Sequence, residues 1–369
     1  MDLTEDMRDL LKLHLIPGLG PRLTAALLER FGSAAAALRA RTAELQQVPH
    51  IGANLASKLR QAIDTLDVQA EIDRLIEHGV TLLRRGHGDY PPALAQIAGA
   101  PELLYVKGRI EPRDAEAVAI VGSRFCTSYG KKTAEKMAGD LARAGFTIVS
   151  GLARGIDGAV HRGALEAGGR TLAVLAGGLS RIYPPEHREL AEQVKDQGAL
   201  LSESAMKMEP MAVLFPARNR IISGLSRGVV VIEAGEKSGA LITATHAAEQ
   251  GREVFAVPGA VDSTASAGTL QLLRKGAKVV RHAQDVIEDL RGIAPLVTPT
   301  QATAEAAAQP PPGLDPLQLR IWELLAQPTY VDDIARRIDV PVAELTRSLM
   351  LIEMKRVIRR LPGNQYERW

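Results

Sequence analysis

One stretch of the chain reads Leu214-Phe-Pro-Ala-Arg-Asn-Arg-Ile-Ile-Ser-Gly-Leu-Ser-Arg-Gly228 and runs directly into Val229-Val-Val-Ile232. The four consecutive β-branched residues predict a strand that is buried on both faces, as the strands of a parallel sheet are. Glu233-Ala-Gly235 marks the end of this strand. Upstream of it, Pro216 is a residue at which a helix can start. The stretch therefore predicts a helix that leads into a central parallel strand.

The same stretch carries positive charge without any acid. Between positions 211 and 232 there is no Asp or Glu, but Arg218, Arg220 and Arg227 all lie there. Since Arg218 and Arg220 closely follow Pro216, we expect backbone N–H groups and guanidinium groups to face one place. This arrangement suits a phosphate better than a carboxylate. The alternative is an ordinary helix start whose arginines pair with surface acids.

Length and composition limit the class of protein. A chain of 369 residues is long enough for two or three domains. The net charge is only +2, so any nucleic-acid binding must come from a local patch. The single cysteine, Cys126, excludes a disulfide framework and fits a reducing compartment. The start of the chain lacks the pattern of a signal peptide, and no apolar run approaches the ~20 residues of a membrane span. We expect a cytoplasmic protein with no membrane segment.

The middle of the chain, residues 86–291, alternates strand-like and helix-like segments. Helical segments are predicted at 131–144 and 156–167, among others. Such alternation predicts an α/β fold, a Rossmann-like and mostly parallel sheet whose ligands bind at the carboxyl ends of the strands. The predicted strands are 118–121, 146–149, 172–175, 199–201, 229–232, 254–257 and 277–280.

Glycines and polar residues gather where these strands end. Glycine lets a backbone approach a ligand closely, and the neighbouring hydroxyl groups and arginines can donate to phosphates. No G-x-G-x-x-G follows the first strand and no G-x-x-x-x-G-K-[ST] occurs, so we do not expect a nicotinamide dehydrogenase or a P-loop ATPase. We expect neither a cofactor nor a metal. The strand-end motifs are Gly122-Ser-Arg124, Ser150-Gly151, Gly177-Gly178, Ser238-Gly-Ala-Leu-Ile-Thr243 and Pro258-Gly259.

One pair of residues has a pattern known from catalytic sites. Asp157 and His161 are four positions apart, on one face of a predicted helix. A carboxylate and an imidazole so placed can orient a general base or help to hold a metal. However, no nucleophile, H-E-x-x-H motif or cysteine cluster accompanies them. We favour a structural role for this pair.

The two ends of the chain form separate predicted domains. Residues 1–85 are predicted to be helical, with Leu15-Ile-Pro-Gly-Leu-Gly20 and Val48-Pro-His-Ile-Gly52 as two helix-hairpin-helix turns. Such turns expose N–H groups that can hold a DNA phosphate. In the second turn His50 stands where the first glycine is expected. Phosphate binding and packing alone both remain open for this SAM-like domain.

Residues 292–313 are rich in proline and alanine and predict a linker. In residues 314–369, helices are predicted near 317–325 and at 331–338 and 342–354, followed by a hairpin around Pro362-Gly-Asn364. This order describes a winged helix. Four cations at the start of the wing suit phosphates, but winged helices also dock proteins, so both functions remain open. These cations are Lys355, Arg356, Arg359 and Arg360.

Taken in order, the motifs of the middle segment resemble DNA-processing protein A, the DprA/Smf family. The resemblance covers most of residues 90–290. It implies a Rossmann-like core that binds single-stranded DNA, without known catalytic turnover. It further implies a dimer that protects incoming single strands in natural transformation and loads the RecA recombinase. The motifs are Val118-Ala-Ile-Val-Gly-Ser-Arg124, Ser150-Gly-Leu-Ala-Arg-Gly-Ile-Asp157 with His161, Tyr183-Pro184, Phe215-Pro-Ala-Arg-Asn-Arg-Ile-Ile222, Glu233-Ala, Ser238-Gly-Ala-Leu-Ile-Thr-Ala244 and Ala256-Val-Pro-Gly259.

The resemblance also implies a DNA-binding site. Arg124 is the first candidate for a phosphate contact. Many family members carry a lysine soon after Tyr-Pro, but here Pro185-Glu-His187 follow, so that contact is absent or Lys207 replaces it. The other implied site residues are Gly122, Ser123, Gly177, Gly178, Arg218, Asn219, Arg220, Lys237 and Thr243.

Aromatic residues are scarce, yet Phe125, Tyr183 and Phe215 lie beside the glycine and arginine loops. They suit base stacking, although ordinary core packing is the alternative. Two other functions remain open. One is a Rossmann-like nucleotide or nucleoside-phosphate hydrolase with Glu233 or Asp157 as its acid, and the other is a protein-interaction scaffold.

For the expected dimer, the apolar positions on a predicted helix after Gly268 are candidates. Cyclic dimers are the commonest soluble oligomers. These positions are Leu270, Leu272 and Leu273.

Overall fold

The computed structural model describes residues 3–291, 314–325, 329–338, 340, 342–355, 357–361 and 365–368. The chain divides into two compact units, Met1–Thr298 and Pro299–Trp369. The predicted helical segment 1–85 thus shares one unit with the sheet. The predicted linker lies outside the described residues.

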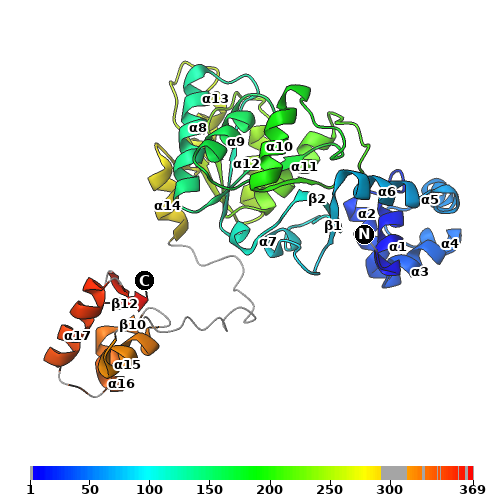
Figure 1. The fold of residues 1–369 in the computed structure, drawn as a ribbon. Helices are drawn as coiled ribbons and strands as arrows, with labels where there is room; N and C mark the ends of the chain where they lie inside the picture. Colours follow the sequence, from blue (N-terminus) through cyan, green and yellow to red (C-terminus); the bar gives the residue numbers. More distant parts are fainter. Residues whose placement is uncertain are drawn as a thin grey trace. The chain divides into compact units, whose positions relative to one another are not determined.

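A sheet forms the centre of the first unit (Figure 1). It has nine strands in the order β1-β2-β6-β5-β4-β3-β7-β8-β9. Strand β2 runs antiparallel to both β1 and β6, and every other neighbouring pair is parallel. The seven predicted strands are confirmed as β3 to β9. The bounds are β1 Thr81–Arg84, β2 Leu103–Gly108, β3 Ala117–Val121, β4 Thr147–Ser150, β5 Thr171–Leu175, β6 Ala199–Ser202, β7 Gly228–Val231, β8 Glu253–Ala256 and β9 Lys278–Val279.

Strands β1 and β2 were not predicted, and the helical prediction for residues 1–85 is wrong at β1. The sequence of β1, Thr-Leu-Leu-Arg, is too short to alternate and has only one buried residue. Pairing with β2, which the sequence cannot reveal locally, makes this segment a strand.

Helices cover both faces of the sheet. On one face, α8, α9 and α14 pack against Val118, Ile120 and Val230. On the other face, α7, α11 and α12 pack against the alternate residues Ala119 and Val121. Because every residue of β3 is buried, the strand is apolar throughout, as the sequence indicated. The helices and 3₁₀ turns are α7 Pro92–Ala95, η1 Pro112–Ala115, α8 Ser128–Arg143, α9 Ile156–Glu166, η2 Pro185–His187, α10 Arg188–Gln197, α11 Leu214–Gly224, α12 Ala240–Glu249, α13 Ala267–Arg274 and α14 Ala283–Arg291.

The N-terminal helices form two hairpins beside the β1–β2 end of the sheet (Figure 1). Gly18 at φ 87° and His50 at φ 69° occupy corresponding turns, so His50 adopts the left-handed backbone that the pattern normally gives to glycine. The side chains of Arg22 and His50 approach within 3.5 Å, which places the turns next to each other. The helices are α1 Glu5–His14, α2 Pro21–Phe31, α3 Ala34–Arg39, α4 Thr42–Leu45, α5 Ala53–Thr65 and α6 Gln69–His78.

This helical region shares its core with the sheet. Leucines of α1 belong to the same apolar cluster as Leu103 and Tyr105 of β2 and Val194 of α10. The buried carboxylate of Glu71 accepts a hydrogen bond from the backbone N–H of Met206 at 2.7 Å. Such continuous packing makes the hairpins part of the core rather than a loosely tethered domain.

The second unit is the predicted winged helix. Its core contains Ile321, Trp322, Leu345 and Leu349, and its sheet has the order β10-β12-β11. The turn at 362–364 and Arg356 lie outside the described residues, and Lys355 and Arg359 are exposed. The elements are α15 Pro316–Leu324, β10 Thr329–Tyr330, α16 Val331–Ile338, α17 Val342–Met354, β11 Ile358–Leu361 and β12 Gln365–Arg368. In neither unit does a described helix have the length and apolar character needed to span a membrane.

Candidate nucleic-acid interface

A pocket of about 760 Å³ opens at the carboxyl ends of β3 and β7. Its walls are the loop after β3, the start of α11 and the segment that leads into α12. Five of the predicted site residues besides Arg124 and Arg218 line it, namely Gly122, Ser123, Asn219, Lys237 and Thr243. The strand-end reasoning thus located the pocket, because parallel strands bring their carboxyl ends to one edge.

Backbone contacts fix the loop after β3. The N–H of Ser123 donates to the carbonyl of Glu233 at 2.8 Å, and the carbonyl of Ser123 accepts from the N–H of Ile156 at 3.1 Å. Gly155 has φ 74°, and a Cβ there would lie 2.7 Å from the carbonyl oxygen of Arg124. Gly155 therefore allows the two loops to touch, which holds Arg124 at the pocket.

The carboxylate of Glu233 is committed to the same loop. It accepts hydrogen bonds from the N–H of Thr127, at 2.8 Å, and from the Thr127 hydroxyl. Glu233 is buried against Gly130 and does not line this pocket. The carboxylate proposed as the acid of a hydrolase thus anchors the start of α8.

Two aromatic rings lie between two arginines, in the order Arg124, Phe215, Tyr183 and Arg154. The first three line the pocket, and Arg154 extends the series beyond the pocket lining. The guanidinium of Arg124 lies 4.4 Å from the ring centroid of Phe215. Phe215 meets Tyr183 edge to face, with their centroids 6.1 Å apart, and the guanidinium of Arg154 lies 5.6 Å from the Tyr183 centroid. We call these four residues the arginine–aromatic row. Phe125, which is 92% exposed, lines the pocket next to Arg124.

Arg218 lies at the floor of the pocket and is only 6% exposed. Its Nη1 donates to the carbonyls of Gly151, at 2.9 Å, and of Val174. Burial lowers the pKa of Arg218 to about 10, and burial raises the pKa of the neighbouring Asp157 carboxyl. A Cβ on Gly151 would lie 2.5 Å from Arg218 Nη2 and 2.6 Å from Asp157 Oδ2. Arg218 is therefore packed among protein groups.

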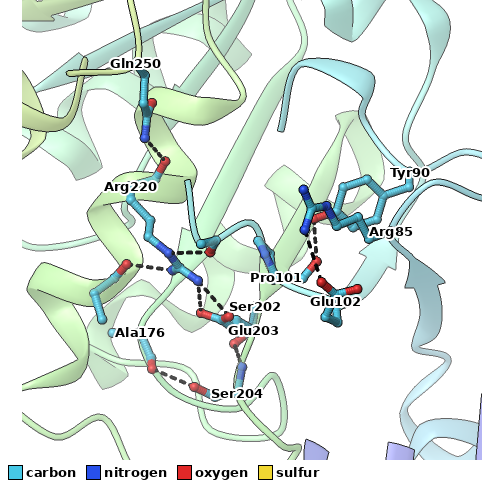
Figure 2. A network of polar contacts seen from close by, with 12 residues as sticks. Arg85, Tyr90, Pro101, Glu102, Ala176, Ser202, Glu203, Ser204, Arg220 and Gln250 are labelled. Carbon is cyan, nitrogen blue, oxygen red and sulfur yellow. Dashed lines mark hydrogen bonds and ion pairs between the residues drawn. The ribbon is translucent and has the colours of Figure 1, made fainter. Parts of the chain in front are cut away.

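Arg220 turns away from the pocket, and the expectation that it faces the same place as Arg218 is wrong. Its Nη2 donates to both carboxylate oxygens of Glu203, at 2.7 and 2.8 Å, and its Nε donates to the carbonyl of Gly99 (Figure 2). The backbone carbonyl of Arg220 accepts from Gln250. Residues two positions apart in a helix do not share a face, and α11 already begins at Leu214.

Three further predicted residues do not line the pocket: Gly177, Gly178 and Lys207. A Cβ on Gly177 would lie 2.9 Å from the carbonyl of Met208, and the position of Gly178 is as crowded. These glycines admit a neighbouring loop of the chain. Lys207 is exposed on that loop.

The Asp157 and His161 side chains face different partners. His161 is fully buried, and its Nδ1 lies 2.8 Å from the hydroxyl of Thr171. Burial lowers the pKa of His161 to about 3, so the imidazole is neutral. Asp157 faces Arg218 instead. Across the described segments, no three His, Cys, Asp or Glu side chains gather as a metal site would require.

The fold and the site together define a class of protein. Its members have a Rossmann-like core with a cationic, aromatic pocket, joined to a helix-hairpin-helix tandem and a winged helix. Family models match all three parts. Residues 81–291 match DNA recombination-mediator protein A, residues 305–364 the DprA winged helix domain, and residues 7–65 the SAM-like helix-hairpin-helix tandem. The chain belongs to the DNA recombination-mediator protein A family, the DprA/Smf family that the motifs resemble.

Individual relatives agree with this assignment. Protein Smf of Synechocystis is 34% identical over 384 residues, 96% of each chain, and Protein Smf of Escherichia coli is 40% identical over 280 residues, 74% of each. The solved structure of DprA from Streptococcus pneumoniae has a TM-score of 0.67 at 34% identity, covering 78% of this chain and 99% of its own. A structure concerning the single-stranded DNA binding mode of Helicobacter pylori DprA has a TM-score of 0.52 at 31% identity, covering 58% and 96%.

Proposed function

We propose that this chain binds single-stranded DNA at the pocket, mainly through the sugar–phosphate backbone, and that it acts as a binding protein rather than an enzyme. The arginine–aromatic row is the observation that carries the proposal. Grooves for single strands combine cations that contact phosphates with aromatic faces that stack on bases, and such stacking tolerates any base. The family and its Helicobacter pylori relative support this choice of ligand.

The charges of the pocket favour a polyanion. Arg124 is exposed at the pocket, and among the described residues no acid forms an ion pair with it. Lys237 adds a second exposed cation. Asp157, the acid that lines the pocket, is buried and faces Arg218. A phosphate would therefore meet donors at the rim before it met a carboxylate.

Titration of a labelled oligonucleotide at several salt concentrations tests the proposal. The substitution Arg124→Ala should weaken binding for every base sequence and reduce the slope of log K against log salt by about 0.7, the value for one phosphate on a single strand. A matched control is Arg113→Ala, because Arg113 is also exposed but precedes the amino end of β3. The parent protein should also leave nucleoside monophosphates unhydrolysed.

Unchanged affinity and salt slope in Arg124→Ala would contradict the proposed pocket. The contacts would then lie at the hairpin turn Pro17-Gly18 or on the basic wing around Lys355.

Membership of the family supports a proposal for the cellular role. We infer that the protein protects incoming single strands in the cytoplasm during natural transformation and loads RecA recombinase onto them. A strand-exchange assay with RecA and an oligonucleotide precoated with single-strand-binding protein tests this role. Addition of the chain should shorten the lag before exchange, and an unchanged lag would contradict it.

We also propose a homodimer through α13. Leu270 and Leu273 are half-buried there, whereas Leu272 packs against the core of the sheet. Light scattering should therefore report a dimer at micromolar concentration, and Leu273→Glu should yield a folded monomer. A parent protein that is monomeric in this measurement would contradict the proposal.

A further inference from the structure

One end of the arginine–aromatic row carries a carboxylate. The Nε and Nη2 of Arg154 donate to the two carboxylate oxygens of Glu186, the second at 3.1 Å. The Nη1 of Arg154 lies 3.4 Å from the hydroxyl of Tyr183, whose ring the guanidinium covers. The Arg154 and Glu186 side chains are 48% and 51% exposed, so the pair stands at the surface.

Glu186 uses the donors that a phosphate would use. A guanidinium binds a carboxylate or a phosphate through the same two parallel N–H groups. Glu186 occupies the Nε–Nη2 edge of Arg154, so a phosphate that binds this edge must displace Glu186. Because the pair is exposed, water can solvate the released carboxylate, and an ion pair of this kind is weak. The exchange of one anion for another therefore has a small net cost.

The other arginines of the site show that this arrangement is particular to Arg154. Arg218 is enclosed by backbone carbonyls, and Arg220 is held by Glu203 away from the pocket. Arg124 lies over Phe215 with no acid in an ion pair among the described residues. In the row, therefore, one arginine is open to a ligand and the other is occupied by an exchangeable carboxylate.

We propose that Arg154 is a second phosphate contact for single-stranded DNA and that Glu186 is a competitor built into the chain. In the free protein Glu186 holds Arg154 over Tyr183. When a strand binds, a phosphodiester takes the place of the carboxylate while a base stacks along Tyr183 and Phe215. This inference rests on the proposed function and adds one phosphate contact to it. It also adds a requirement, because the bound strand must supply enough phosphate contacts to displace Glu186.

Removal of the competitor is the test. Glu186→Gln should tighten binding of a labelled oligonucleotide by about two- to fivefold at low salt, the range that the measured strengths of exposed ion pairs allow. The slope of log K against log salt should change little, because the same phosphate is bound in the parent and in the variant. Arg154→Ala should weaken binding and flatten the slope.

A control separates the exchange from a general gain in positive charge. Glu192 of α10 is also 51% exposed and forms ion pairs, with Lys107 and Lys195, but neither lysine belongs to the arginine–aromatic row. Glu192→Gln changes the net charge equally and should alter affinity less than Glu186→Gln does. In an Arg154→Ala background, Glu186→Gln should give no gain beyond that of Glu192→Gln, since the coupling of two residues vanishes when one is removed.

Two results would overturn the inference. An equal gain for Glu186→Gln and Glu192→Gln would show that Glu186 acts only through net charge. Weaker binding in Glu186→Gln would show that Glu186 positions Arg154 rather than competing for it. In either case binding by the parent protein would leave the proposed function standing, whereas a parent that does not bind the oligonucleotide refutes both. Circular dichroism confirms that the variants, changed at exposed positions, are folded.

Discussion

Replacing Arg218 with methionine separates a structural arginine from a ligand contact. Methionine keeps an unbranched chain of similar length but removes the guanidinium. The carbonyls of Gly151 and Val174 then lose a donor, and the buried Asp157 loses the cation that faces it. Removing one partner of a buried charge pair destabilises a protein by about 3–5 kcal/mol, since the remaining charge is left unpaired in the interior. We expect the free energy of unfolding of Arg218→Met to be lower than that of the parent by an amount in this range.

The loss should depend on pH in a defined direction. Burial already raises the pKa of Asp157, and without Arg218 that pKa should rise further. A carboxyl whose folded pKa is raised favours folding when protonated, and this contribution is lost as pH rises through the folded pKa. The deficit of Arg218→Met relative to the parent should therefore be smaller at about pH 4, near the ordinary Asp pKa, than at about pH 8.

Urea unfolding followed by far-ultraviolet circular dichroism measures this loss. Tryptophan fluorescence would not serve, because Trp322 and Trp369 both belong to the C-terminal unit. Arg113→Ala is the control, since its side chain is 63% exposed. The opposite result would be a free energy of unfolding within about 1 kcal/mol of the parent's, as is typical of a change at a surface position, together with a loss of oligonucleotide binding. That result would contradict a structural role. Arg218 would then be a DNA contact.

Three other changes have expected outcomes. A chain that ends after Arg291 should fold and bind oligonucleotides with the affinity of the full chain, because the two compact units have separate cores; an insoluble or inactive product would place the winged helix in the site. Gly151→Ala should lower the urea midpoint and weaken binding, since its Cβ would meet Arg218 Nη2 at 2.5 Å; an unchanged midpoint would contradict this packing. Thr127→Val should cost about 1 kcal/mol as a lost helix cap, and it should weaken oligonucleotide binding because the loop keeps the N–H bond to Glu233 but loses the hydroxyl bond; unaltered affinity would show that the loop does not need this hydroxyl.

The parallel part of the fold was predictable because its signal is local. Strands such as β3 and β7 are buried on both faces, so their sequences are unbroken apolar runs bounded by glycine or charge. The segment 81–84 gives no such signal, because only Leu82 is buried and the partner residues lie 19 to 25 positions further along the chain. Its prediction as helix failed for that reason.

The glycines at the strand ends predicted where the edge of the pocket lies. They did not predict which group fills the space beside each glycine. At Gly122 a Cβ would meet Ile156 at 2.6 Å, and at Gly177 it would meet the carbonyl of Met208 at 2.9 Å. In both places the close neighbour is the chain itself. A glycine in a sequence indicates only that another group can approach the backbone closely. The tertiary structure is required to identify that group.

The arginines show where sequence reasoning stops and why. Arg218 and Arg220 are two positions apart, and at 3.6 residues per turn two positions rotate a side chain by about 200°. Helix geometry alone therefore predicts that the two side chains point in different directions, whichever residue begins the helix. Helix geometry does not predict which of the two arginines turns toward the sheet, because that depends on how α11 packs against β5 and α12. Arg154 is the opposite case: it lies in a quoted motif without being a predicted contact, and only the placement of Tyr183 and Glu186, some thirty residues later, gives it a ligand-like environment. A motif thus locates the edge of a site, while the burial and partners of each cation decide which of them can meet a phosphate.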